Sequence, residues 1–198
     1  MNANKRIGLV ACSKTKAAEP APARELYQGR LFRLASAYAE RMCDEWYILS
    51  AKHGLVHPNT ILKPYNMSLN DTDRDAQVEW GANVLLALRG MGHLDPTYPT
   101  SWLILAGKKY RKFTVPGLVG DSICIPLAGM GIGQQLSWLT DTLQELDLPR
   151  CRMCVVGIPT GDPGGLCSGC QSYVAATRGM KYEDATVRSA ESFPALHD

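Results

Sequence analysis

The sequence has no long apolar run, no secretory leader pattern and no large excess of charge, and each absence excludes a class of protein. No stretch approaches the roughly 20 apolar residues that a membrane-spanning helix requires. Residues 1–6 lead directly into an apolar run without the regions that make up a signal peptide. The 21 lysine and arginine residues nearly balance the 19 aspartate and glutamate residues, for a net charge of +2. We therefore expect a cytoplasmic protein that does not enter a membrane.

The composition is that of an ordinary folded domain. Hydrophobic residues make up 45% and charged residues 20% of the 198 positions, which excludes disordered and fibrous proteins. This length allows one sizeable core and a small appendage. The net charge neither requires nor excludes nucleic acid, but basic residues gather at positions 14–16 and 108–112. These two clusters would form a basic patch if their loops are neighbours.

Short apolar runs alternate with segments of helical periodicity. The runs are at residues 6–12, 46–49, 101–106 and 122–127, and the helical segments at about 23–42, 74–89 and 134–146. A strand, a helix and a second strand in succession form a right-handed, parallel unit in nearly all known cases. The predicted fold class for residues 1–149 is therefore α/β, with an open, mainly parallel sheet and helices on both faces.

The seven cysteines fall into two groups. Cys12, Cys43 and Cys124 are scattered through apolar surroundings, which predicts small buried core residues and not a disulfide framework. The other four form two C-x-x-C pairs separated by a glycine-rich segment, and two such pairs can hold a metal tetrahedrally. We predict a structural zinc ion, with a redox pair or an iron-sulfur cluster as alternatives, in a zinc-knuckle element and tail at residues 150–198. The predicted ligands are Cys151, Cys154, Cys167 and Cys170.

Polar residues follow the predicted strands where ligands bind in open α/β sheets, beyond the carboxyl ends of the strands. Ser13 and Lys14 follow the first strand, and Lys52 and His53 follow the second. An ordinary solvated loop would give the same pattern. Asp71 lies in a segment that also suits the N-terminal cap of the helix at 74–89.

A glycine-rich turn at residues 128–133 leads into the last predicted helix. Such turns let backbone N–H groups approach an anion such as phosphate. The spacing is not that of the dinucleotide-binding fingerprint, which follows the first strand. Tight packing of the helix would explain the glycines equally well.

Several of these segments together resemble a family of uncharacterised actinobacterial and phage proteins. The shared motifs span roughly residues 6–146 and comprise Cys12-Ser13-Lys14-Thr15-Lys16, Leu26-Tyr27, Leu31-Phe32, residues 49–56, Pro64-Tyr65, Leu69-Asn70, Pro126-Leu127 and Gly133-Gln134-Gln135-Leu136. More distantly, the chain is similar to the YaaA family of DNA-binding proteins and to uracil-DNA-glycosylase-like domains.

The resemblance implies a nucleic-acid or nucleobase site at the carboxyl edge of a uracil-DNA-glycosylase-like sheet. Glycosylases of that fold take a base out of the stack and hydrolyse its N-glycosidic bond. Two departures matter. Cys12-Ser13-Lys14 stands where those enzymes carry a water-activating aspartate, and residues 126–129 replace their His-Pro-Ser loop.

Breaking an N-glycosidic bond requires a donor for the departing base and a group that orients water. Lys52 and His53 are candidates for the first role, an amide or carboxylate near position 70 for the second, and Tyr65 could stack on a base. The predicted catalytic residues are Ser13, Lys52, His53, Asn70 and Asp71. The predicted substrate-binding residues are Cys12, Lys14, Tyr65, Asn66, Lys108, Lys109, Tyr110, Arg111, Gly131 and Gln134.

The resulting hypothesis is an N-glycosylase that excises a modified nucleobase from DNA and leaves an abasic site, with anti-phage defence as the expected setting. The expected partner is nucleic acid, DNA in preference to RNA. One alternative is a transferase that modifies the base of a nucleoside, nucleotide or transfer RNA. Another is a nucleic-acid-binding module without catalytic activity.

Overall fold

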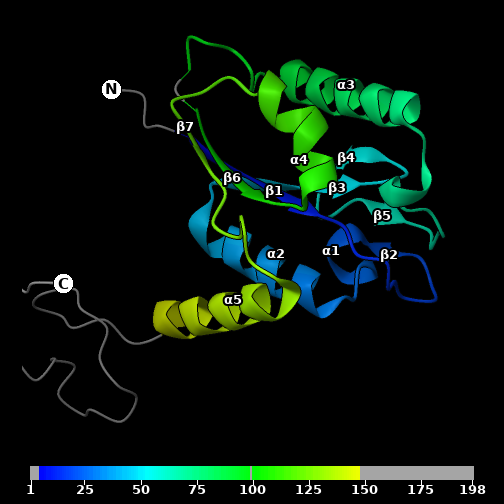
Figure 1. The fold of residues 1–198 in the computed structure, drawn as a ribbon, viewed down its shortest axis with the longest axis vertical. Coiled ribbons are helices and arrows are strands. Elements are labelled where there is room, and N and C mark those ends of the chain that lie inside the picture. Colours follow the sequence, from blue (N-terminus) through cyan, green and yellow to red (C-terminus); the bar gives the residue numbers. More distant parts are fainter. Residues whose placement is uncertain (1–4, 99, 148–198) are drawn as a thin grey trace, which may run out of the picture. The chain divides into compact units, whose positions relative to one another are not determined.

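A five-stranded sheet forms the centre of the computed structural model, which describes residues 5–98 and 100–147 (Figure 1). The strand order is β4-β3-β1-β6-β7. The bounds are β1 Lys5–Ala11, β3 Glu45–Ser50, β4 Gly54–Val56, β6 Thr100–Leu105 and β7 Ser122–Cys124. Four strands are parallel and β4 is antiparallel to β3. The predicted α/β class with a mainly parallel sheet is confirmed, whereas the sequence analysis did not foresee β4.

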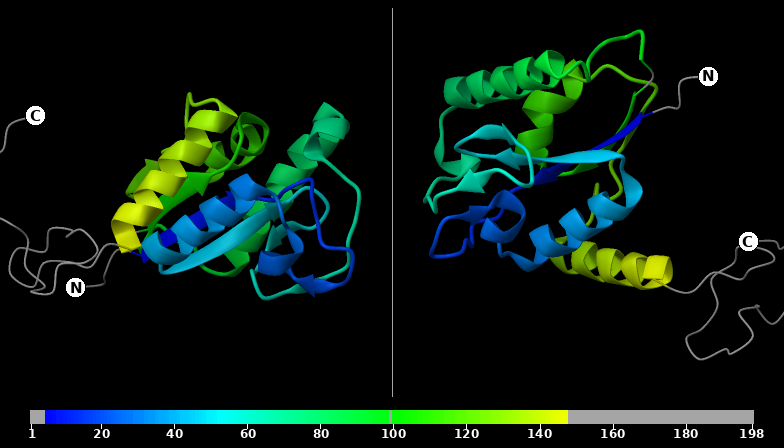
Figure 2. Two further views of the ribbon diagram at one scale, coloured as in Figure 1. Left: turned by 90° about the horizontal axis from the view of Figure 1, so that it is seen from below. Right: turned by 180° about the vertical axis from the view of Figure 1, so that it is seen from behind.

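Helices cover both faces of the sheet. Figures 1 and 2 show α3 and α4 on one face and α2 and α5 on the other. No described helix is both long and apolar enough to cross a membrane. The remaining elements are a small β2-β5 sheet and two 3-10 turns. The bounds are α1 Ala23–Leu26, α2 Arg30–Met42, α3 Arg74–Gly90, α4 Lys108–Thr114, α5 Ile132–Asp147, β2 Ala21–Pro22, β5 Ile61–Leu62, η1 Leu69–Asp71 and η2 Val115–Gly117.

The single helix predicted at residues 23–42 is wrong, because the chain leaves the helical conformation between α1 and α2. Tyr27 is extended (φ −84°, ψ 109°) and forms an isolated bridge with Lys16. Gly29 is also extended and passes close to Ser13, where an added Cβ would lie 2.7 Å from the Ser13 Cβ. A contact with a loop distant in sequence therefore overrides the helical periodicity at this point.

The core lies on both faces of the central strands. Ile7, Leu9, Ile48, Leu103 and Ile104 are fully buried, as expected for parallel strands covered on both faces. On one face α3 contributes Trp80, Val84 and Leu88 to this core; on the other face the buried side chains include Phe32, Ala35 and Ala39 from α2 and Leu139 and Leu143 from α5.

The cysteine prediction is only partly confirmed. Cys12, Cys43 and Cys124 are free thiols, but Cys12 and Cys43 are only half-buried and Cys124 is exposed. The reason for the exposure of Cys124 is its place in β7, a three-residue strand at the edge of the sheet.

The connections between strands reverse direction at β1. From β1 the chain passes through α2 to β3 on one side, and it later passes from α3 to β6 on the other side of β1. In open α/β sheets the crevice beyond the carboxyl ends of two such strands is where ligands bind. The topology therefore selects the carboxyl ends of β1 and β6.

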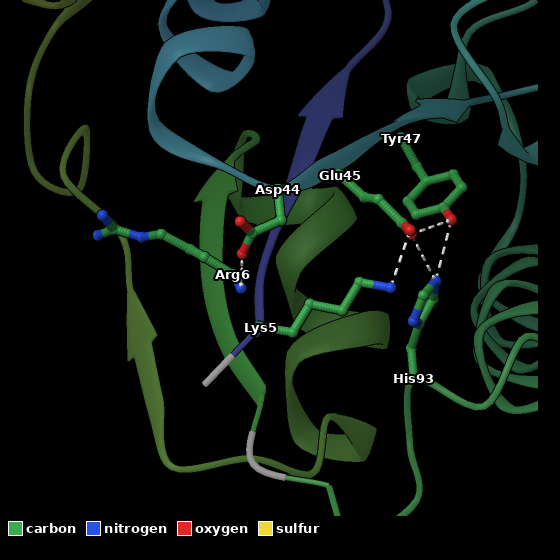
Figure 3. A network of polar contacts seen from close by, with 6 residues as sticks. All are labelled: Lys5, Arg6, Asp44, Glu45, Tyr47 and His93. Carbon is green, nitrogen blue, oxygen red and sulfur yellow. Dashed lines mark hydrogen bonds and ion pairs between the residues drawn. The ribbon is translucent and has the colours of Figure 1, made fainter. Parts of the chain in front are cut away.

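A polar network at the opposite, amino end of the sheet joins β1, β3 and the segment after α3 (Figure 3). Lys5 Nζ lies 2.8 Å from Glu45 Oε1, and the Tyr47 hydroxyl donates to Glu45 Oε2 at 2.9 Å. His93 Nε2 lies 2.9 Å from that hydroxyl and 3.4 Å from the same carboxylate oxygen. Nearby, the main-chain N–H of Arg6 donates to Asp44 at 2.7 Å.

The network shifts the pKa of three of its members. The hydrogen bond from Lys5 lowers the pKa of Glu45, and burial raises the pKa of Tyr47 to about 12. Burial lowers the pKa of His93 in spite of the neighbouring carboxylate. His93 is only 6% exposed, so the folded protein favours its neutral form.

Acidification should destabilise the protein through this network. The pKa of His93 is lower in the folded than in the unfolded chain, so the unfolded chain takes up the proton first as the pH falls below about 6.5. Glu45 acts in the same direction below about pH 4.5, because its folded pKa is also lowered. Urea unfolding from about pH 7.5 to about pH 5.5 should show a fall in the free energy of unfolding. The fall should be smaller in His93→Gln than in the parent, and equal falls in the two proteins would contradict this role.

Gly81 should be intolerant of a side chain although it lies inside a helix. An alanine there would gain about 1 kcal/mol of helix propensity. Its Cβ, however, would lie 2.6 Å from both the Cβ and the carbonyl oxygen of Phe113, so α3 and the end of α4 would have to move apart. We expect Gly81→Ala to lower the free energy of unfolding by about 1–3 kcal/mol.

Gly90→Ala is the matched control for this substitution, because nothing lies within 4 Å of an added Cβ at that helical position. It should leave the free energy of unfolding unchanged or raise it slightly. Chemical denaturation of the two variants measures both, and a Gly81→Ala protein as stable as the parent would contradict the close approach.

Candidate functional site

A cavity of about 710 Å³ lies at the point that the topology selects. Residues 11–13 at the end of β1 and residues 105–108 at the end of β6 line it. Residues 29–32 at the start of α2 and residues 129–132 before α5 complete the wall. We call it the switch-point cavity. Its volume falls within the roughly 300–1,000 Å³ typical of small-molecule sites.

The charged residues that line the switch-point cavity are all basic. They are Arg30, Lys108 and Arg111, and no aspartate or glutamate of the described chain lines the cavity. The Nε atom of Arg111 is buried and has no hydrogen-bond partner among the described residues. Buried polar atoms are nearly always paired in folded proteins, so an unpaired one calls for an explanation.

A cluster of hydroxyl groups lies at the carboxyl end of β3. The Tyr65 hydroxyl is 2.8 Å from the Tyr27 hydroxyl and 2.8 Å from Ser50 Oγ. Ser50 Oγ in turn accepts the main-chain N–H of His53 at 3.1 Å. Lys16 Nζ lies 4.2 Å from the centre of the Tyr65 ring, and the His53 ring meets that ring edge-on. Tyr65 thus contacts three loops, and the Lys16 ammonium already lies over one face of its ring.

Burial sets the protonation of this hydroxyl cluster. It raises the pKa of Tyr27 and of Tyr65, and it lowers the pKa of Lys16. Tyr110 shows the same upward shift, also from burial, and its hydroxyl lies 3.4 Å from Cys12 Sγ. The tyrosines are therefore protonated at neutral pH and can act as hydrogen-bond donors.

A second cavity, of about 420 Å³, opens beside α3. Its polar lining consists of Lys52 and His53 after β3 together with Glu79 and Asn83 from α3. Burial and the adjacent Lys52 charge both lower the pKa of His53, so its imidazole is neutral at pH 7. We call this the α3 cavity. It combines a cation, a neutral imidazole, a carboxylate and an amide in one place.

The structure brings together about half of the predicted site residues. Cys12, Ser13, Lys108, Arg111 and Gly131 line the switch-point cavity, Lys52 and His53 line the α3 cavity, and Tyr65 contacts His53. Tyr110 reaches the first cavity only through its hydroxyl contact with Cys12. The remaining predicted residues line neither cavity: Lys14, Asn66, Asn70, Asp71, Lys109 and Gln134.

Ser13 and Gln134 have local structural contacts. Ser13 Oγ donates to the Thr15 carbonyl at 2.6 Å and accepts the Gly29 N–H at 3.1 Å. Gln134 Oε1 accepts the N–H of Gly131 at 2.9 Å, which closes the turn before α5. Asp73, and not Asp71, caps α3 by accepting the N–H of Ala76.

Sequence reasoning missed several residues of the two cavities and the hydroxyl cluster. Arg30 and Glu79 were placed only within helical stretches, and Tyr27 only within a helical stretch and a shared motif. A signal for Arg30 existed, since it follows a glycine at the break between α1 and α2. No comparable signal marks Glu79, because only packing of α3 beside the end of β3 brings it to Lys52.

The predicted zinc ligands Cys151, Cys154, Cys167 and Cys170 lie outside the described residues. Within residues 5–98 and 100–147, no group of three or more histidine, cysteine, aspartate or glutamate side chains could hold a metal ion.

A comparison with protein families places the chain in one of them, and a second comparison finds a similar protein. Residues 7–141 match the model described as "Family of unknown function (DUF6884)", and the chain belongs to this family. It is also similar to "Uncharacterized protein YfjM" of Bacillus subtilis (strain 168), with 26% identity over 151 residues. That alignment covers 71% of this chain and 97% of the relative. Residues 7–141, which match the family model, include all the lining residues of both cavities.

Removal of the Tyr65 hydroxyl should destabilise the loops at this edge. Tyr65→Phe would leave the buried Tyr27 hydroxyl and Ser50 Oγ each without one partner. We expect the free energy of unfolding to fall by about 1–2 kcal/mol. Tyr98→Phe, at a residue 58% exposed, is the matched control and should have no effect. If chemical denaturation gave Tyr65→Phe the same free energy of unfolding as the parent, the hydroxyl cluster would contribute nothing to stability.

Proposed function

We propose that this member of the family is an enzyme that cleaves the N-glycosidic bond of a nucleotide in DNA and releases the base. The observation that carries the proposal is the polar lining of the α3 cavity. Lys52, His53 and Glu79 meet there at the carboxyl end of a central strand. These are the types of group that the reaction requires.

Each polar group of the α3 cavity has a role in this chemistry. Rupture of the bond leaves negative charge on the departing base and positive charge on the sugar. The Lys52 ammonium would stabilise the base as it leaves, and the Glu79 carboxylate would stabilise the sugar. Neutral His53 would accept a proton from the attacking water, whose oxygen bonds to the sugar carbon. A proton returned to the base nitrogen completes the hydrolysis.

The basic surface of α4 supports a nucleic acid as the substrate. Lys109 and Lys112 are exposed on this helix, and exposed lysines bind backbone phosphates without reading sequence. Binding through such contacts weakens steeply as salt is added. The preference for DNA, for a modified base and for a role in phage defence rests on the sequence resemblance, as does a uracil-DNA-glycosylase-like fold.

A base-exchanging transferase is the second candidate, and the position of Cys12 favours it. Cys12 is one of the residues that line the switch-point cavity, and no described carboxylate lines this cavity. A thiol is an intrinsically strong nucleophile. Such an enzyme would act on a nucleoside, a nucleotide or transfer RNA and would replace the base.

Base release from phage DNA tests the proposal directly. Purified protein is incubated with genomic DNA from several phages, including DNA with hypermodified bases, and abasic sites and free bases are measured by mass spectrometry. We expect release from at least one DNA, with a rate that falls as the pH decreases below about 6.5, because the pKa of His53 is lowered from its usual value. Lys52→Ala and Glu79→Gln should each reduce the rate about 100-fold or more.

Lys63→Ala is the matched control, because Lys63 is an exposed loop lysine that lines neither cavity. It should leave the rate of base release unchanged. Absence of release from every DNA, together with salt-sensitive binding, would reject the glycosylase. Base exchange on transfer RNA or free nucleotides would then identify the transferase, and binding alone would identify a non-catalytic module.

A further inference from the structure

The charged residues of the switch-point cavity are all basic, and the proposed base-release reaction does not use them. Arg30, Lys108 and Arg111 line it without a described carboxylate beside them. Three cations around a concave site create a positive potential that attracts an anion. The charge of the lining therefore selects an anionic ligand.

The buried Nε atom of Arg111 narrows the choice of anion. It has no acceptor among the described residues and no access to solvent. Because Arg111 lines the cavity, a small shift of its side chain would let this donor pair with an acceptor atom bound there. Guanidinium groups bind phosphate oxygens through paired N–H donors, which suits Arg111 better than a lysine for this task.

Two long helices begin at the wall of the same cavity. The first residues of α2 follow Gly29, which makes no side-chain cap, and those of α5 follow Gly131. Gly129, in the turn before α5, has φ +81°, and an added Cβ there would meet no atom within 4 Å. Free N–H groups in a first helical turn favour an oxyanion, and glycines let it approach the backbone.

The shape and charge of the cavity distinguish an end group from a chain. An internal phosphodiester carries one negative charge and continues as a strand on both sides. A phosphate monoester carries nearly two charges and three free oxygens, and it can enter a cavity end-on. The second description matches a concave site that is lined by three cations.

We propose that the switch-point cavity binds a terminal phosphate group, either on a free nucleotide or on the phosphorylated end of a nucleic-acid strand. The Arg111 guanidinium donates to the phosphate oxygens, and Arg30 and Lys108 add positive charge around them. The inference deepens the proposed function by naming the type of nucleotide, and it relies on that function only for the base-bearing part of the ligand.

The test compares ligands that differ only in the phosphate. Calorimetry at constant ionic strength measures the binding of inorganic phosphate, of a nucleoside and its 5′-monophosphate, and of one oligonucleotide with and without a 5′-phosphate. We expect inorganic phosphate to bind and the 5′-phosphate to raise the affinity at least tenfold in one of the two pairs. The pair that responds identifies the source of the phosphate. The effect should vanish in Arg111→Gln and be weakened in Arg111→Lys, which retains the charge but lacks the planar group.

Arg89→Gln is the matched control, since Arg89 is exposed at the end of α3 and lines neither cavity. It should bind every ligand as the parent does, and its circular dichroism and that of Arg111→Gln should match the parent. Equal affinity for phosphorylated and unphosphorylated ligands, or equal effects of Arg89→Gln and Arg111→Gln, would overturn the inference. A rate of base release that does not depend on the phosphate would leave the glycosylase proposal intact. Phosphate binding without any base release would reject the glycosylase proposal alone.

Discussion

The parallel pairing of β1 with both β3 and β6 is the constraint on which the rest of the structure depends. A strand held between two parallel neighbours must be buried on both faces, and the connections on its two sides run in opposite directions. Helices then cover both faces, and four strands end at the same edge. The loops that follow these strands carry polar groups, and they lie beyond the sheet. Both cavities are formed there, so their position follows from the strand pairing.

The charged groups are paired at the amino end of the sheet, whereas those of the switch-point cavity at the carboxyl end are all basic. At the amino end Lys5, Glu45, Tyr47 and His93 satisfy one another within 3.4 Å (Figure 3). At the carboxyl end the switch-point cavity gathers basic side chains without an acid, and Arg111 keeps a buried donor unpaired. A network of the first kind stabilises the fold and is sensitive to acid. An arrangement of the second kind is completed only by a ligand.

Tyr65 connects the two candidate regions without belonging to either lining. Its hydroxyl is fixed by Ser50 at the end of β3 and by Tyr27 before α2. Its ring contacts His53, which lines the α3 cavity, and Lys16, in the loop that follows β1. Hydroxyl groups held by buried partners position the loops around them before a ligand arrives. The edge of the sheet is thus preorganised although it is built from loops.

The sequence by itself determined the α/β class, the four parallel strands and the presence of Lys52, His53, Lys108 and Arg111 after strand ends, because apolar runs and helical periodicity are local patterns. Contacts within the folded chain set the break at Tyr27 and Gly29, the added strand β4 and the position of Glu79 in the same cavity as Lys52. They also left Asn70 and Asp71 outside both cavities. These outcomes depend on contacts between segments far apart in the chain, such as that of Gly29 with Ser13. Local sequence patterns carry no information about the energies of such contacts.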